Sequence, residues 1–91
     1  MADVIITIKI MPESPETDLK AITDKTSEIV KGFGGEVGRV TEEPLAFGIK
    51  SLNIIFVNDE SSGSTEPLEQ KVALIEGVKS VEITDVRRAI G

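Results

Sequence analysis

The chain has no cysteine, histidine, tryptophan or tyrosine, and only three of its 91 residues are phenylalanine. Without cysteine it can form neither disulfides nor a thiolate metal site. Without histidine it lacks the usual general base near neutral pH and the commonest zinc ligand. Carboxylates, lysines and hydroxyls remain, so covalent catalysis is not excluded. The composition nevertheless favours a function that works through binding.

The balance of charge narrows the choice of partner. Sixteen acidic residues against ten basic ones give a formal net charge of −6. Nucleic-acid-binding domains usually carry the opposite sign, because neutralised phosphates supply much of their affinity. No apolar stretch approaches the ~20 residues needed to cross a bilayer, and the acidic start Met1-Ala2-Asp3 is unlike a signal peptide. We therefore expect a cytoplasmic protein that binds neither nucleic acid nor a membrane directly.

The hydrophobic pattern predicts six elements in a single domain over residues 1–91. Alternating β-branched residues indicate strands, and apolar residues three and four apart indicate helices. The first helix is expected to be about five turns long, with Ser14 as its cap and Pro15 as its first residue. The other elements are predicted over Val4–Met11, Glu36–Ala46, Ile49–Val57, Thr65–Glu76 and Val78–Val86.

The resulting order β-α-β-β-α-β is typical of the ferredoxin-like α+β sandwich, which has a four-stranded antiparallel sheet in the order 4-1-3-2 and both helices on one face. The first and third strands are the most continuously apolar, as central strands should be. The second strand contains Gly38, which suggests a bulge, and Pro44, which cannot donate to a ladder. These features predict an edge strand.

The outer face of the two central strands bears on a possible RNA-binding role. An RNA-recognition sandwich needs aromatic side chains there to stack on bases. None of the six residues predicted on this face can do so: Ile5, Thr7, Lys9, Ser51, Asn53 and Ile55. The main alternative function, from a different functional class than binding to another protein, is that of a ferredoxin-like regulatory module. Such a module senses a small ligand and dimerises through its sheet.

Two features deserve a functional interpretation beside a structural one. Phe47 lies beside Gly48 where the chain reverses between two strands, and it is either a contact residue or a plug for one end of the sandwich. Arg87 and Arg88 are adjacent cations near the end of an acidic chain, and they serve either general solubility or a partner.

Three segments of the chain resemble archaeal members of the translation elongation factor 1-beta family, and together they span almost the whole sequence. The middle one, Glu43 to Leu52, contains the family's Phe-Gly-Ile/Leu motif as Phe47-Gly48-Ile49. The other two are Ile8-Lys9-Ile10-Met11-Pro12-Glu13-Ser14-Pro15 near the start, and Glu76-Gly77-Val78 followed by Val81-Glu82-Ile83-Thr84-Asp85-Val86-Arg87-Arg88 near the end.

The resemblance implies a guanine-nucleotide exchange factor that accelerates GDP release from the GTPase elongation factor 1-alpha, without covalent chemistry or a cofactor. In eukaryotic relatives the domain contacts two domains of the GTPase and disturbs its Mg²⁺ and phosphate site, with help from a lysine near the C-terminus. The motif phenylalanine also lies at that interface.

These roles carry over to the present sequence unevenly. Phe47 and Gly48 match the motif directly. The lysine has no counterpart, because the chain ends Arg87-Arg88-Ala89-Ile90-Gly91. Lys50, Arg87 and Arg88 are therefore the candidate cations for partner binding. We expect the free protein to be a monomer.

Overall fold

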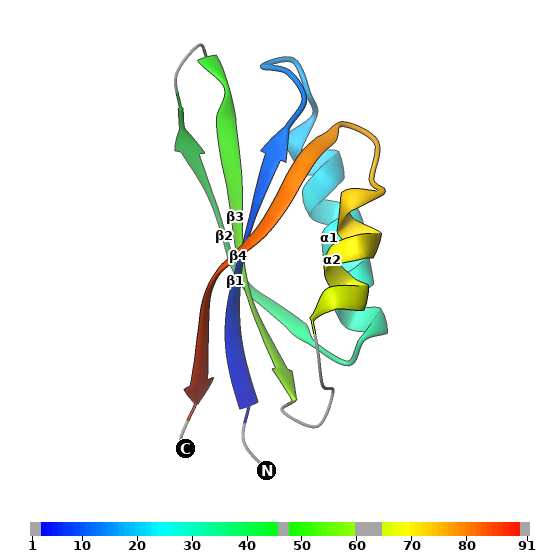
Figure 1. Ribbon diagram of the computed structural model, residues 1–91, viewed down its shortest axis with the longest axis vertical. Coiled ribbons are helices and arrows are strands. Elements are labelled where there is room, and N and C mark those ends of the chain that lie inside the picture. The colour runs from blue at the N-terminus through cyan, green and yellow to red at the C-terminus, as the bar shows by residue number, and fades with distance from the viewer. Residues whose placement is uncertain (1–2, 46–47, 60–64, 90–91) are drawn as a thin grey trace.

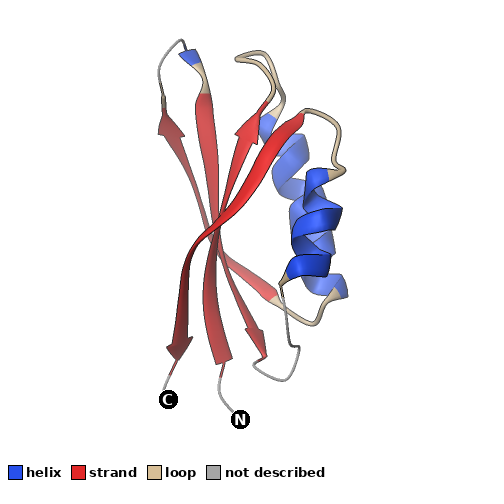
Figure 2. Ribbon diagram, viewed as in Figure 1, coloured by secondary structure: helices blue, strands red, loops and turns tan. Residues whose placement is uncertain are grey.

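The computed structural model describes residues 3–45, 48–59 and 65–89. Its elements in chain order are β1 (Asp3–Pro12), α1 (Leu19–Gly32), β2 (Glu36–Pro44), β3 (Lys50–Asp59), α2 (Glu66–Ala73) and β4 (Val78–Ala89). The strands form one antiparallel sheet in the order β2-β3-β1-β4. Both helices lie on the same face of this sheet (Figures 1 and 2). The predicted ferredoxin-like sandwich, with the first and third strands central, is confirmed.

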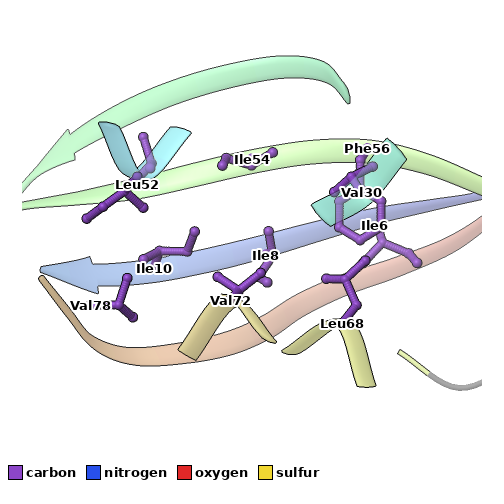
Figure 3. Packing of buried hydrophobic residues seen from close by; sticks show 11 residues of the cluster. Ile6, Ile8, Ile10, Val30, Leu52, Ile54, Phe56, Leu68, Val72 and Val78 are labelled. Atoms are coloured by element: carbon purple, nitrogen blue, oxygen red, sulfur yellow. The ribbon is translucent and has the colours of Figure 1, made fainter. Parts of the chain in front are cut away.

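The core fills the space between the sheet and the two helices. Alternate residues of each central strand point toward the helices, where they are removed from water (Figure 3). Burying each large aliphatic or aromatic side chain contributes about 1.5–3 kcal/mol. The cluster consists of Ile6, Ile8 and Ile10 from β1, Leu52, Ile54 and Phe56 from β3, Ile22 and Val30 from α1, Leu68 and Val72 from α2, and Val78 from β4.

Strand β2 is an edge strand with most of its residues exposed. Its pairing with β3 shifts between Val37 and Arg39, so Gly38 forms the predicted bulge. Because of the bulge, Val37 pairs with Phe56 and Val40 with Ile54, and both valines lie on the helix side of the sheet. The bulge thereby brings two valines that are out of step in sequence onto one face.

The start of α1 differs from the prediction that Ser14 caps it. Asp18 is the cap, and its Oδ1 accepts hydrogen bonds from the backbone N–H groups of Lys20 at 3.0 Å and Ala21 at 3.2 Å. Ser14 begins a turn instead, in which the Thr17 N–H donates to the Ser14 carbonyl oxygen at 3.2 Å. Pro15 favours this turn because its fixed φ suits the second turn position. The helix is accordingly 14 residues long, about four turns.

Strand β4 is longer than predicted and includes Arg87 and Arg88. Its pairing with β1 shifts between Thr7 and Ile8, which leaves Thr84 as the extra residue of a bulge. The Thr84 hydroxyl donates to the Thr7 carbonyl oxygen at 3.4 Å. Continued pairing with β1 keeps both arginines within the sheet.

The buried face of α1 contains one polar residue, Thr26, with no exposed surface. Its hydroxyl has no hydrogen-bond partner among the described residues. The nearby Thr23 differs, because its hydroxyl donates to the Leu19 carbonyl oxygen at 2.8 Å. A buried polar group without a partner costs roughly 1–3 kcal/mol. The buried hydroxyl of Thr26 therefore makes the folded protein less stable than an apolar side chain of the same shape would.

We expect Thr26→Val to stabilise the fold by about 1 kcal/mol, because valine has the same shape and no hydroxyl to desolvate. In a domain of this size the melting temperature should rise by roughly 4–8 °C. Thr23→Val is the matched control and should give no such rise, since it removes a hydrogen bond. An unchanged or lowered melting temperature for Thr26→Val would contradict the prediction.

Candidate functional site

The predicted site residues that the structure describes lie at two opposite ends of the sheet. Lys50 begins β3, whereas Arg88 pairs with Val4, which in turn pairs with Asn58 near the far end of β3. At a strand rise of ~3.3 Å per residue, Lys50 and Asn58 are about 26 Å apart. In Figure 1 the start of β3 lies at the end of the molecule opposite the C-terminus. Gly48 and Lys50 are thus brought together, and the two arginines form a separate group.

Gly48 gives the first end its backbone geometry. It has φ +74°, in the left-handed region that residues with a Cβ rarely adopt. Apart from its two neighbours in the chain, no atom of the described residues lies within 4 Å of the position where a Cβ would be, and Gly48 is exposed. Just beyond it, the Leu45 N–H donates to the Ile49 carbonyl oxygen at 2.7 Å and closes the connection between β2 and β3.

Lys50 lies beside a carboxylate that sequence reasoning missed. Its Nζ is 4.0 Å from Oε1 of Glu42, and the side chains are 57% and 49% exposed respectively. An exposed pair at this distance contributes little to stability. The lysine therefore remains available for a different anionic partner. These two residues lie together only because β2 pairs with β3. The register between the two strands is therefore the feature that could have identified Glu42 as a neighbour of Lys50.

A groove of about 320 Å³ lies next to Gly48 and Lys50. One wall is the segment that leads from β1 into α1, which is fixed by a 2.8 Å hydrogen bond from the Glu13 N–H to the Gly77 carbonyl oxygen. The lining is mostly polar and contains both charges: Pro12, Ser14, Pro15, Thr17, Asp18, Leu19, Lys20, Glu42, Gly48 and Lys50. The sequence did not suggest that the β1–α1 segment belongs to this end of the molecule. The antiparallel pairing of β1 with β3 places it there.

Arg87 and Arg88 point to opposite faces of the sheet because they are neighbours in a strand. Arg88 pairs with Val4 and lies on the helix side, while Arg87 pairs with Ile5 on the other side. The Arg87 Nε is 2.9 Å from Oδ2 of Asp85, and the arginine side chain is 77% exposed. The two cations can therefore not act as one tight cluster on a single surface.

Phe47, the residue matched most directly to the motif, lies outside the described residues, and so does the adjacent Ala46. Its role stays a prediction. The structure does describe Leu45 and Gly48 on either side of it, at the end of the sheet that carries the groove.

Two other kinds of site, a metal centre and a membrane-spanning helix, can be checked against the described residues. In residues 3–45, 48–59 and 65–89, no three or more acidic side chains gather in a way that could hold a metal ion. Within the same residues, no helix is long and apolar enough to cross a membrane. What the site presents is exposed charge and a fixed backbone shape, which suit recognition of another molecule.

Comparison with known proteins identifies the family. A family model described as the EF-1 guanine nucleotide exchange domain matches residues 5–89. The chain belongs to this family. Its function is therefore guanine nucleotide exchange in translation elongation, as the resemblance in sequence implied.

Archaeal members of the elongation factor 1-beta family are similar over almost their full length. The elongation factor 1-beta of Methanothermobacter thermautotrophicus is 46% identical over 88 residues, which cover 97% of this chain and 98% of the relative. That of Methanosphaera stadtmanae is 43% identical with the same coverage. That of Staphylothermus marinus is 39% identical over 89 residues, covering 97% of this chain and 98% of the relative.

Solved structures of other proteins share the fold. The ACT domain from the GTP pyrophosphokinase of Chlorobium tepidum has a TM-score of 0.61 at 18% identity, covering 89% of this chain and 97% of that domain. The C-terminal domain of the MgtC protein from Mycobacterium tuberculosis has a TM-score of 0.62 at 11% identity, covering 98% and 88%. At such low identity the likeness shows the fold alone.

Proposed function

We propose that residues 1–91 act as one exchange domain that accelerates GDP release from elongation factor 1-alpha in the cytoplasm, by binding alone. The observation that carries this proposal is the family match over residues 5–89. The composition supports the absence of covalent chemistry, since the chain has no histidine and no cysteine. No cofactor is needed for such a reaction, because no covalent bond is made or broken.

The energetic demand on such a domain is modest. Exchange requires tighter binding to the nucleotide-free GTPase than to the GDP-bound form, and this coupling is reciprocal. A thousandfold faster release corresponds to about 4 kcal/mol. A few hot-spot contacts can supply that amount. A small domain with exposed anchors on a stiff sheet is sufficient.

The separation of the two candidate groups supports contact with two parts of the GTPase. Gly48 and Lys50 lie at one end of β3, and Arg88 lies opposite the other end. The resemblance implies that relatives contact two domains of their GTPase. We infer that the Gly48 end and the Arg88 end each meet one of these domains. The pleated backbone of β3 between them then holds the two contacts at a nearly constant distance.

At a catalytic ratio to the GTPase, the protein should speed release of labelled GDP from the cognate elongation factor 1-alpha by orders of magnitude, and it should hydrolyse no GTP on its own. Stopped-flow fluorescence measures the release. An unchanged release rate together with tight binding of an amino acid or nucleotide would instead support the ligand-sensing module.

Phe47→Ala should slow exchange by about 30-fold, which corresponds to ~2 kcal/mol of lost partner binding. A phenylalanine anchor contributes this much when it enters a partner pocket, and its loss should leave the melting temperature nearly unchanged. A strongly lowered melting temperature with normal exchange per folded molecule would show that Phe47 is a plug of the sandwich instead.

Lys50→Ala and Arg88→Ala should each slow exchange by roughly tenfold, the loss of ~1.4 kcal/mol of charged contact. Because the two residues are well separated, the losses in the double variant should multiply within about twofold. Lys25→Ala on the outer side of α1 removes the same charge and should stay close to the unmodified protein. Equal losses in all three single variants would mean that the cations provide only long-range steering, which salt screens.

A further inference from the structure

One face of the sheet has no helix against it in the described part of the chain (Figures 1 and 2). Its middle consists of the outward-pointing residues of β1 and β3, which pair directly: Ile5 with Val57, Thr7 with Ile55, and Lys9 with Asn53. These side chains are only half-buried, although they lie on the two central strands. Ser51, also predicted to be exposed on this face, is instead buried, and its hydroxyl donates to the Glu43 carbonyl oxygen at 3.4 Å.

Charge is distributed unevenly over this uncovered face. Between residues 5 and 11 of β1 and residues 51 and 57 of β3, Lys9 is the one charged residue on this side. The edge strands carry charges of both signs around that middle. By register, these are Glu36, Arg39 and Glu43 on β2, and Glu82, Asp85 and Arg87 on β4. Protein interfaces have this anatomy, with a centre depleted of charge and a polar rim.

The helix layer on the opposite side of the sheet exposes different kinds of residue from the uncovered face. The outward side of α1 is charged, with exposed residues of both signs such as Asp24, Lys25 and Glu28. The large aliphatic residues that are exposed on this side of the described chain lie on separate elements: Leu74 just after α2 is 85% exposed, Val86 on β4 58% and Val40 on β2 38%. Single exposed apolar residues are ordinary. A group of aliphatic residues in register on the two central strands of a sheet is not.

The position of the uncovered face links it to the proposed interface. Arg87 lies on this face at one end, and Gly48 lies beyond Ser51 at the other. A partner that reaches both ends must extend over about 26 Å of the sheet. The sheet face connects the two ends without crossing the helix layer. The strands run along the longest axis of the molecule, which measures 42 Å, so the sheet is long enough for a partner to reach both ends (Figure 1).

We propose that this uncovered sheet face, centred on Ile5, Ile55 and Val57, docks directly on the GTPase between the two end contacts. This inference rests on the proposed function and adds to it a third contact surface. The matching patch on the GTPase is aliphatic, with charges of both signs around it. A second copy of the chain is the less suitable occupant, because each copy brings a net charge of −6 and like charges oppose association.

The first experiment replaces aliphatic residues by threonine, which already occupies this face at Thr7. In Ile5→Thr/Ile55→Thr, the concentration that gives half-maximal GDP release should rise about tenfold or more, with release at saturation less affected. The control Val40→Thr/Leu74→Thr makes two matching aliphatic-to-threonine changes on the helix side, and should stay within twofold of the unmodified protein. Melting curves of both variants show whether the fold is retained, and the single variant Ile55→Thr serves if the double variant unfolds.

The second experiment uses the unmodified protein and so does not depend on folding of a variant. Methyl groups are labelled, and saturation is transferred from the nucleotide-free GTPase in the complex. The Ile5 and Ile55 methyl signals should lose intensity, whereas those of Leu74 should not. Unperturbed Ile5 and Ile55 signals, with exchange by Ile5→Thr/Ile55→Thr equal to that of the unmodified protein, would overturn the proposal.

Two further outcomes distinguish the ways in which the inference can fail. If light scattering shows a dimer that Ile5→Thr/Ile55→Thr converts to a monomer while exchange is unchanged, the face belongs to a second copy and the proposal is wrong. If the unmodified protein does not accelerate GDP release at all, the proposed function fails together with this inference. Normal exchange by the unmodified protein and by the double variant overturns the docking surface alone.

Discussion

The pairing of β1 with β3 is the interaction on which the rest of the molecule depends. Each strand contributes three buried aliphatic or aromatic side chains to the core, and each is flanked on its other side by an edge strand. With three phenylalanines and no cysteine, the chain has neither large aromatic clusters nor disulfides to add stability. Aliphatic residues in correct register must therefore hold the sheet. A slip of one residue would turn every one of them toward solvent.

The same pairing determines where function can be placed. Because β1 and β3 run antiparallel, the end of one strand lies beside the start of the other. This brings the β1–α1 segment next to Gly48 and Lys50, and it carries Arg87 and Arg88 to the far end through β4. The sheet thus acts as a rigid spacer between two sets of exposed side chains, and its uncovered face fills the distance between them. Functional groups on such a scaffold need little ordering when a partner binds.

Much of this arrangement follows from local pattern. The alternation in residues 4–11 and 49–57 identified the central strands, and Gly38 and Pro44 marked the edge strand with its bulge. The start of α1 could not be predicted in this way, because both Ser14 and Asp18 are good caps. The turn at Pro15, together with the hydrogen bond from Glu13 to Gly77, decides between them. Long-range pairing likewise sets the distance between Lys50 and the arginines, and the position of Glu42 beside Lys50. Neither can be read from spacing along the chain.

The bulge at Thr84 has a consequence for how this family can vary. It displaces the register of β4 against β1 by one residue, so every side chain from Asp85 to Arg88 lies on the face opposite to the one that unbroken alternation would give it. A relative of the same length whose β4 paired with β1 without this bulge would present its first arginine on the helix side and its second on the open face, whereas a relative that simply lacked the bulge residue would keep the present arrangement. Two sequences with the same Arg-Arg ending could thus show opposite electrostatic surfaces. The pairing of β4 with β1 around position 84 should therefore be compared before the arginines of two relatives are taken to lie on the same face.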